Sequence, residues 1–300
     1  MNKKIYLSGK MTGLPNNGYE LFDKNRDFLI DLGHEVISPA DIDRSIGINP
    51  TAPFTEEQYH ETIKRDYAAL LECDSIAFLN NWTESRGAKL ESDFANILKL
   101  DRYRVDADNS YFEKEIIVAL TGFARAGKNT IAEEFVMNDG FEQRGFADSI
   151  KDILYGLNYR VYVDESQGIG IVGYIPIASL VDTLGWEEAK KIPEVRQSLQ
   201  KLGMEERSAL GEDIWINTLF SQPHKARLVI SDLRLENEAE EVRRRGGVIV
   251  RVIRDGVGPA NDHVTEQINF DADITIFNNG TPKESYMQII EQLTKFGINL

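Results

Sequence analysis

A glycine-containing loop between an apolar run and an amphipathic segment constrains the fold of this chain more than any other stretch. Residues 116–120 are all apolar, residues 122–130 read Gly-Phe-Ala-Arg-Ala-Gly-Lys-Asn-Thr, and an amphipathic segment begins at Ile131. This order predicts a buried strand, a phosphate-binding loop and a helix, because the loop N–H groups and the positive end of the helix dipole face one concavity. A plain glycine turn between a strand and a helix is the alternative interpretation.

The loop has the lysine of a triphosphate site but departs from the usual pattern at the next residue. Lys128 is placed to reach the outer phosphates of a nucleotide. Ser or Thr usually follows this lysine and ligates Mg²⁺ through its hydroxyl, whereas this chain has Asn129 there and Thr130 one position later. The sequence therefore predicts a bound triphosphate and leaves the metal ligand unidentified.

The chain length and a polar segment near residue 105 predict two domains. Three hundred residues exceed the usual size of a single domain. Residues 101–110 have neither helical nor strand periodicity and are rich in Asp, Asn and Ser. We therefore expect a first domain over residues 1–105, a linker over 106–114 and a second domain over 115–300. Both are expected to be three-layer α/β domains with a parallel sheet.

The charge and the cysteine count disfavour several classes of protein. Lys and Arg total 34 against 49 Asp and Glu, which gives a formal net charge of -15. Polymeric nucleic acid and anionic membranes would be repelled by such a chain, whereas small phosphorylated ligands can still bind at local loops. The single cysteine, Cys73, cannot form an intramolecular disulfide, and the scattered histidines lack metal-site spacing. We expect a cytoplasmic protein without a membrane span.

Two acidic residues in the first hundred are candidates for glycosyl chemistry. Strand, helix and strand patterns alternate there, which predicts a parallel sheet with ligands at its carboxyl edge. Glu91 lies early in a helix that follows a strand, and Asp66 lies late in the preceding helix, so one cleft can receive both. A carboxylate can attack an anomeric carbon while a second acid manages protons. Two solvated carboxylates on helix faces are the alternative.

Several motifs around these two acids resemble the nucleoside 2-deoxyribosyltransferase superfamily. The resemblance implies a Rossmann-like domain in which Glu91 is the nucleophile and Asp66 assists at the base or sugar. It also implies a nucleotide-contacting set of Ser8, Gly9, Met11, Ser85 and Gly87. The matching segments are Ser8–Gly13, Gly33–Pro39, Arg65–Asp66, Cys73–Asp74, Trp82 and Ser85–Glu91.

Ser85 bears on which activity this resemblance implies. The transferases carry an aspartate six residues before the glutamate, whereas Ser85 matches the relatives that hydrolyse nucleoside 5'-monophosphates. A neutral hydroxyl accommodates a phosphate that an aspartate would repel. The resemblance therefore implies a 5'-nucleotide N-glycosidase more than a base-exchanging transferase. A degenerate domain that only binds nucleotides is the alternative, and the subunit-spanning sites of such relatives are compatible with a homo-oligomer.

Charged residues after residue 115 are candidates for phosphoryl transfer. Asp148 and Lys151 stand at i and i+3 where a short strand enters a helix, and they either face an acceptor nucleotide or form an ordinary helix ion pair. Asp232 and Arg234 follow a buried strand, where an aspartate can hold Mg²⁺ and an arginine can neutralise a transferred group. Guanidinium groups also match phosphate oxygens in pairs. The candidates of this last kind are Arg196 and Arg207.

The order of motifs across residues 115–295 resembles the deoxynucleoside monophosphate kinases of tailed bacteriophages. That family moves the γ-phosphate of ATP to a deoxynucleoside monophosphate with Mg²⁺, and some members have Asn or Asp after the loop lysine. The matching segments are 122–130, 146–151, 196–203, 207–215, 232–239, Arg254 and 263–266.

By position, this resemblance implies three groups of site residues. Asn129 and Asp232 are the implied metal ligands, and Asp232 and Arg234 serve the transferred phosphate. The implied ATP-binding set is Gly122, Arg125, Ala126, Gly127, Lys128, Asn129 and Thr130. The implied acceptor set is Asp148, Lys151, Arg196, Arg207 and Trp215.

Together the two resemblances imply a bifunctional enzyme of nucleotide metabolism. Its ligands would be small nucleotides, with ATP and Mg²⁺ serving a kinase in the second domain and nucleoside monophosphates entering a glycosidase in the first. A nucleotide-sensing or sequestering protein, in which one or both sites bind without turnover, is the alternative.

Overall fold

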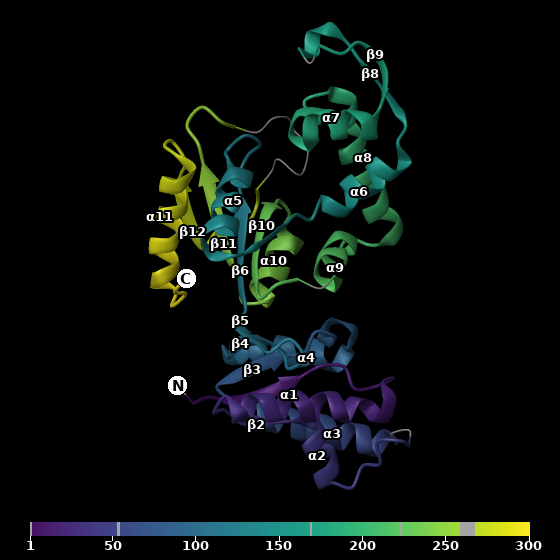
Figure 1. Cartoon of the computed structure of the whole chain (residues 1–300), viewed down its shortest axis with the longest axis vertical. Coiled ribbons are helices and arrows are strands. Elements are labelled where there is room, and N and C mark those ends of the chain that lie inside the picture. The colour runs from purple at the N-terminus through teal and green to yellow at the C-terminus, as the bar shows by residue number, and fades with distance from the viewer. Residues whose placement is uncertain (1, 53–54, 169, 223, 259–267) are drawn as a thin grey trace.

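Two five-stranded sheets organise the chain, one before and one after residue 115 (Figure 1). The computed structural model describes residues 2–52, 55–168, 170–222, 224–258 and 268–300. We call residues 2–114 the N-terminal unit and residues 115–300 the C-terminal unit. The matched segment 263–266 lies outside the described residues. Within the described part of the chain, no helix is both long and apolar enough to cross a membrane.

The sheet of the N-terminal unit has the order β2-β1-β3-β4-β5, and its first four strands are parallel. Successive side chains of its strands point to opposite faces of the sheet, and each face is covered by helices. Ile5 and Leu7 pack on the side of α1, while Tyr6 packs with Ile76 on the side of α3 and α4. This is the predicted parallel α/β arrangement. The strands are β1 (Lys4–Ser8), β2 (Glu35–Ile37), β3 (Ser75–Phe78), β4 (Asp101–Asp106) and β5 (Tyr111–Lys114).

The helices of this unit begin and end at residues that suit helix termini. Thr55 and Gln58 form a capping box at the start of α3, which satisfies two backbone N–H groups that a helix leaves unpaired. Ser85 caps α4 in a similar way by accepting from the Ala88 N–H. The helices are η1 (Pro15–Gly18), α1 (Tyr19–Asp31), α2 (Pro39–Ser45), α3 (Glu56–Leu71), η2 (Trp82–Glu84) and α4 (Arg86–Leu98).

The segment 106–114, which the sequence predicted to be a linker, is part of the first sheet. Strand β5 pairs antiparallel with β4, and the rings of Tyr103 and Phe112 stack with centroids 4.7 Å apart. The Asp106 carboxylate accepts from Asp108 and Asn109, so the polar residues form a hairpin turn. Asp, Asn and Ser favour turns as strongly as linkers, which is why composition alone misplaced the boundary. Only Glu115 separates β5 from the next strand.

The sheet of the C-terminal unit has the order β12-β11-β6-β10-β7 and is parallel throughout. One face packs on α5 and α11, and the other packs on α9 and α10. Both neighbours of β6 come from later in the sequence, so the glycine loop after β6 lies at the centre of the sheet. The strands are β6 (Ile116–Thr121), β7 (Glu142–Arg144), β10 (Arg227–Leu233), β11 (Val248–Ile253) and β12 (Ile274–Phe277).

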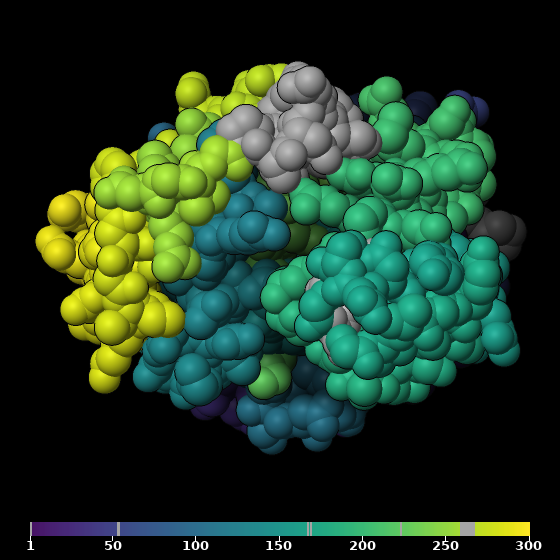
Figure 2. Space-filling view, turned by 90° about the horizontal axis from the view of Figure 1, so that it is seen from above, coloured from purple at the N-terminus to yellow at the C-terminus, as the bar shows by residue number. Residues whose placement is uncertain are grey.

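A helical group with its own apolar core stands beside this sheet (Figure 1). It carries the β8–β9 hairpin, whose two strands pair antiparallel. Seen from above, the surface is hollowed between this teal and green group and the blue residues around α5 (Figure 2). The elements are α5 (Lys128–Asp139), α6 (Asp148–Leu157), β8 (Arg160–Val163), η3 (Glu165–Gln167), β9 (Gly173–Pro176), α7 (Ile177–Ala189), α8 (Pro193–Leu210), α9 (Ile214–Ser221), α10 (Glu236–Arg244) and α11 (Pro282–Lys295).

The two units meet at a buried group of arginines. Arg102 donates to the Glu115 carboxylate at 2.9 Å, whereas Arg104 comes no nearer to it than 4.0 Å. Arg245, from the end of α10, lies over the Trp82 ring of the N-terminal unit with 5.1 Å from its guanidinium carbon to the ring centroid. All three guanidinium groups are buried. The contact between the two units therefore consists of arginine stacking on an aromatic ring and one carboxylate near two arginines.

Candidate functional sites

The glycine loop has the geometry of a phosphate-binding loop. Strand β6 ends at Thr121 and α5 begins at Lys128, which confirms the predicted strand, loop and helix. The Lys128 ammonium donates to the carbonyl oxygens of Gly122 and Phe123 at 2.8 and 2.9 Å, and only 7% of this residue is exposed. Its charge is therefore held across the loop that it follows. Arg125 has a φ of 69°, a left-handed conformation that shapes the loop tip.

Asn278, just after β12, supports this loop and was missed by the sequence reasoning. Its amide nitrogen donates to the Ala126 carbonyl at 2.7 Å, and its amide oxygen accepts from the Ser285 hydroxyl at 2.8 Å. Gly127 has a φ of 94°, and a Cβ there would lie 2.2 Å from the Asn278 amide nitrogen. The glycine is thus required by both conformation and space. The sequence signal that could have identified Asn278 was a polar residue at the end of a strand near β6. The sequence Asn278-Asn279-Gly280 is, however, also typical of a turn.

Asp232 lies at the carboxyl end of β10, directly beside β6, as expected from the sequence. Its two carboxylate oxygens accept from the backbone N–H groups of Phe146 and Ala147 at 2.7 and 3.0 Å. The residue therefore fixes the turn that leads into α6. Each carboxylate oxygen has a further lone pair, so a cation could still be ligated there.

Asp148 and Lys151 form the helix ion pair that was the alternative interpretation of their spacing. The Lys151 ammonium donates to Asp148 at 2.6 Å, and the other Asp148 oxygen accepts from the Gly145 N–H. Burial alone would lower the pKa of Lys151, but the charges of Asp148, Asp232 and Glu187 raise it. The pair nevertheless lies near the strand ends, because Lys151 is within electrostatic reach of Asp232. A charged lysine is therefore held beside the loop.

The remaining acceptor candidates differ in position. Arg207 donates to the Glu238 carboxylate at 2.8 Å, and Arg196 and Arg234 are half-buried. Trp215 is only 4% exposed and donates through its indole nitrogen to the Gly203 carbonyl at 3.1 Å. Its ring packs inside the protein, and the expectation that Trp215 surrounds the acceptor stays a prediction.

Glu238 connects several of these groups and was not singled out as a site residue. It accepts from the N–H groups of Arg234 and Leu235 at the start of α10, in addition to the guanidinium of Arg207. Burial and, to a smaller extent, the nearby charge of Asp232 raise the pKa of Glu238 to about 7. Glu238 thus fixes both the chain after Asp232 and the direction of Arg207.

In the N-terminal unit, the structure brings Asp66 and Glu91 together, as the sequence predicted. Glu91 accepts from the Ser8 hydroxyl at 2.5 Å and from the Tyr6 hydroxyl at 3.2 Å. Asp66 and Glu91 are 8% and 9% exposed, so the alternative of two solvated carboxylates is wrong. Burial raises the pKa of both acids, and the charge of Glu91 raises that of Asp66 further. Two carboxyl groups so placed tend to share a proton near neutral pH.

The other expected nucleotide contacts lie on separate segments of this unit. Ser85 and Gly87 are at the amino end of α4, the helix that also carries Glu91. Gly9 packs so closely on Leu79 that a Cβ would come within 2.7 Å of that side chain. Met11 is partly buried against the core beside α1.

Asp43, from α2, is a further buried acid that the sequence reasoning missed. It accepts from the Tyr19 and Thr62 hydroxyls at 3.0 and 3.3 Å. Its charge also raises the pKa of Asp66. No spacing rule connects α2 with α3 and α4, so only the tertiary fold could reveal this third acid.

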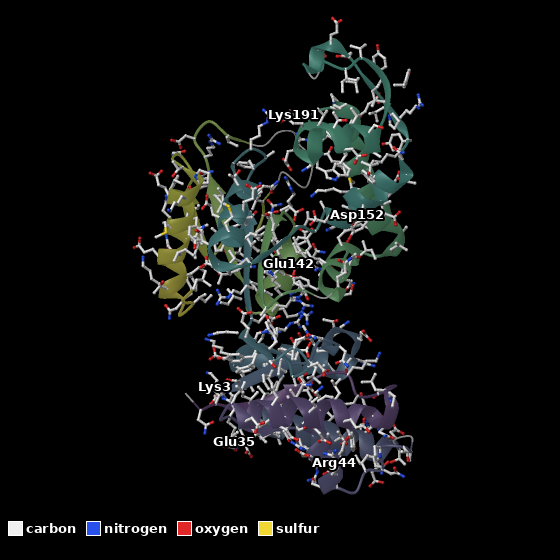
Figure 3. The ribbon with its side chains drawn as sticks, in the orientation of Figure 1. Lys3, Glu35, Arg44, Glu142, Asp152 and Lys191 are labelled. Atoms are coloured by element: carbon white, nitrogen blue, oxygen red, sulfur yellow. The ribbon has the colours of Figure 1, made fainter. Side chains whose placement is uncertain are left out.

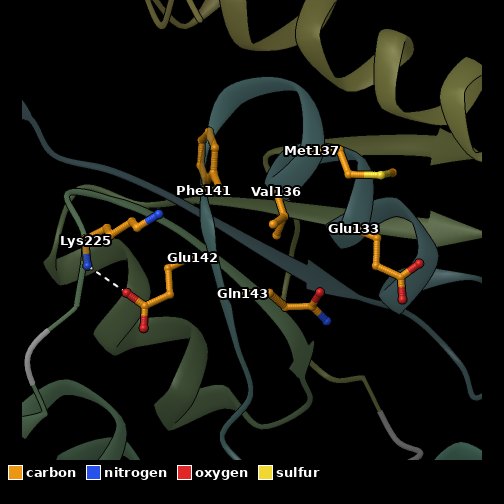
Figure 4. Close-up of a pocket in the computed structure, with 7 residues that line it drawn as sticks. All are labelled: Glu133, Val136, Met137, Phe141, Glu142, Gln143 and Lys225. Atoms are coloured by element: carbon orange, nitrogen blue, oxygen red, sulfur yellow. Dashed lines mark hydrogen bonds between the residues drawn. The ribbon is translucent and has the colours of Figure 1, made fainter.

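An apolar pocket on the C-terminal unit lies apart from these candidates. It has a volume of about 490 Å³ and opens between α5 and the edge strand β7 (Figure 4). The Lys225 backbone N–H donates to Glu142 at its rim. None of the candidate residues lines it, so it is not part of either site. Its lining residues are Glu133, Val136, Met137, Phe141, Glu142, Gln143 and Lys225.

Comparisons with known proteins bear on both units. Residues 3–101 match a family model described as a domain of unknown function, DUF4406. A protein of Acanthamoeba polyphaga mimivirus named "Putative deoxynucleotide monophosphate kinase" is 25% identical over 194 residues, which cover 58% of this chain and 94% of that protein. A match of that length is longer than the N-terminal unit, so it includes residues of the C-terminal unit.

The chain is also similar to solved structures, among them two shikimate kinases. The shikimate kinase from Aquifex aeolicus has a TM-score of 0.32 and 12% identity, and it covers 61% of this chain and 99% of its own. The shikimate kinase from Bacteroides thetaiotaomicron has a TM-score of 0.28 and 11% identity, with 60% and 98% covered.

Proposed function

We propose that the C-terminal unit is a domain that phosphorylates deoxynucleoside monophosphates from ATP. The observation that carries this proposal is the position of Lys128, whose ammonium spans the loop after β6, while Asp232 lies at the carboxyl end of the neighbouring strand β10. A phosphate loop, a lysine and a carboxylate on the neighbouring strand are the recurring parts of phosphoryl transfer. The similarity to a protein named as a deoxynucleotide monophosphate kinase supports the substrate class.

In this proposal the chain acts mainly by positioning and by charge. The loop amides and Lys128 hold the β- and γ-phosphates, and Lys151 with Arg207 holds the acceptor phosphate in line for attack. Glu238 keeps Arg207 in place and fixes the turn after Asp232. Asp232 would hold Mg²⁺, and the metal would supply positive charge to the phosphates there.

The donor set near the loop is compatible with Mg²⁺. The described residues contain no group of three His, Cys, Asp or Glu that could hold a metal by themselves. Magnesium, however, usually takes one or two carboxylates and completes its shell with phosphate oxygens and water. Asp232 offers one such carboxylate, and Asn129 stands at the second residue of α5.

A direct assay tests the kinase proposal. Purified protein is incubated with each deoxynucleoside monophosphate, ATP and Mg²⁺, and the nucleotides are separated by anion exchange. We expect a diphosphate from at least one acceptor, and we expect it to form about a hundred- to a thousandfold more slowly with the Lys128→Ala variant. Binding of ATP and acceptor without any diphosphate would instead support a sensing or sequestering protein.

For the N-terminal unit we propose hydrolysis of the N-glycosidic bond of nucleoside monophosphates. The buried Asp66 and Glu91 pair, with Ser8 and Tyr6 bonded to Glu91, is the observation that favours this second function. The Glu91 carboxylate would attack C1' of the sugar and form a glycosyl ester, while protonated Asp66 gives its proton to the leaving base. Water then attacks C1', Asp66 takes a proton from it, and Glu91 leaves as a carboxylate.

Base release is the test of this second function. Each nucleoside monophosphate is incubated without ATP, and free base is measured by reversed-phase chromatography. We expect release from at least one nucleotide and more from monophosphates than from the same nucleosides, because the amino end of α4 at Ser85 favours an anion. If no nucleotide releases its base, the proposal for the N-terminal unit is wrong.

A further inference from the structure

Glu187 lies at the phosphate loop although it is 58 residues away from it in sequence. The Asn129 amide nitrogen donates to the Glu187 carboxylate at 3.0 Å. Helix α7 makes this contact possible because it is interrupted at Gly185, which has φ and ψ of 74° and 163°. The residues after this kink turn toward α5, and Figure 3 shows Lys191 just beyond the end of the same helix.

The position of this contact matters for metal binding. Asn129 directly follows Lys128 and is the second residue of α5, which is where a phosphate loop normally has the hydroxyl that ligates Mg²⁺. The Asn129 amide nitrogen cannot ligate a metal ion, but its hydrogen bond holds a Glu187 carboxylate oxygen beside it. The chain thus has an acidic oxygen at the place where its loop lacks the usual hydroxyl.

The charges around Glu187 keep its carboxylate ionised. Burial alone would raise its pKa, but the hydrogen bond from Lys190 at 2.8 Å and the charges of Lys190, Lys151 and Lys128 lower it. The Glu187 side chain is nevertheless 67% exposed. An incoming cation and its phosphates can therefore reach it.

We propose that Glu187 is a metal-holding residue, which supplies the oxygen ligand that the phosphate loop lacks at Asn129. This inference rests on the proposed kinase function and identifies a residue that neither the motifs nor the comparisons assign. Glu187 from α7 and Asp232 from β10 give two carboxylates, as many as Mg²⁺ usually takes from a protein when phosphates complete its shell. The helical group that carries α7 would then contact ATP through the metal.

The same geometry has one competing interpretation. A carboxylate near Lys128 and Lys151 can also act as a latch that neutralises these lysines until the phosphates of ATP displace it. The two interpretations differ in how nucleotide binding depends on metal. A metal-holding residue strengthens the effect of Mg²⁺ on nucleotide affinity, whereas a latch weakens nucleotide binding equally with and without metal.

Calorimetry on the full-length protein separates them. A non-hydrolysable ATP analogue is titrated in excess Mg²⁺ and again in EDTA, and the ratio of the two dissociation constants measures the coupling between metal and nucleotide. We expect Glu187→Gln to reduce this ratio about tenfold relative to the unmodified protein. An unchanged ratio overturns the proposal, and tighter binding by the same factor in both solutions identifies the latch.

A matched control lies at the next residue. Glu188 pairs with Lys191 as Glu187 pairs with Lys190, and it too is solvent-accessible, so Glu188→Gln should leave the ratio unchanged. Lys128→Ala identifies the binding that belongs to the phosphate loop. If the unmodified protein binds the analogue with metal coupling but transfers no phosphate, the kinase proposal fails while the role of Glu187 in metal binding is still measured.

Discussion

The two candidate sites treat acidic groups in opposite ways. In the N-terminal unit, Asp66 and Glu91 are removed from solvent and receive hydroxyl donors, so burial raises the pKa of both. In the C-terminal unit, Glu187 is exposed and surrounded by lysines, which lower its pKa. The first arrangement retains protons and suits acid–base chemistry, whereas the second retains charge and suits binding of metal and phosphate. Two sheets of similar architecture thus offer different chemistry through the surroundings of their carboxylates.

Glu91→Gln should produce the largest effect, and this effect should be confined to the site in the N-terminal unit. The amide keeps the shape but cannot attack C1', so base release should fall by at least about a thousandfold. Diphosphate formation should remain within about twofold, since no candidate kinase residue lies in the N-terminal unit. Both rates are measured on one preparation. A parallel loss of both activities would contradict separate sites.

Lys128→Ala should have the next largest effect, and this effect should be confined to the site in the C-terminal unit. Its ammonium is the charged group held across the phosphate loop, and loss of one such stabilising donor typically reduces a rate by about a hundred- to a thousandfold. The initial rate of diphosphate formation at saturating ATP measures this change. Unaltered base release is the internal control, and a normal kinase rate would remove Lys128 from the mechanism.

Asn278→Ala should weaken ATP binding about tenfold without contacting ATP. The change leaves the Ala126 carbonyl and the Ser285 hydroxyl without their partner, which costs about 1–3 kcal/mol. Calorimetric titration with an ATP analogue measures the shift. Asn279→Ala is the matched control, because Asn279 accepts from the Asp255 N–H at exposed positions. Equal effects of the two changes would argue against a support role for Asn278.

Asp66→Asn should give the smallest effect for each pH unit, and it is seen in the pH dependence of stability. The raised pKa of Asp66 means that the folded chain keeps a proton that the unfolded chain loses above about pH 4, so this group favours unfolding increasingly as pH rises toward the folded pKa. The asparagine variant is free of this penalty. The free energy of unfolding of the variant minus that of the unmodified protein should therefore increase by about 1 kcal/mol per pH unit between pH 5 and pH 8.

Urea unfolding of both proteins at pH 5, 6.5 and 8 measures this difference. Asp31→Asn, at an exposed position at the end of α1, should show no such trend. A difference between Asp66→Asn and the unmodified protein that stays constant with pH would mean that Asp66 is already ionised in the folded state.

Local patterns predicted the parts of this structure that depend on neighbouring residues. The loop before Lys128 and the parallel strands around it follow from apolar runs and glycine spacing. The approach of Asp66 and Glu91 follows from the rule that strand ends of a parallel sheet meet at one edge.

The residues that were missed come to their sites through tertiary packing. Asn278 reaches the loop from the last strand, Asp43 reaches Asp66 from α2, and Glu187 reaches Asn129 only because α7 is interrupted at Gly185. No spacing rule connects such distant segments. The error at residues 106–114 has a related origin, since a polar segment can be a hairpin turn as well as a linker.

The short connection through Glu115 limits how the two halves can be exchanged between proteins. A gene fusion would normally allow either half to be cut out and expressed alone. Here a cut after Lys114 would remove the carboxylate that Arg102 contacts and would uncover Arg104 and the Trp82 ring. A buried charge that loses its partner is strongly destabilising. Recombination at this point would therefore require compensating changes on both sides, and the halves are expected to be inherited as a pair.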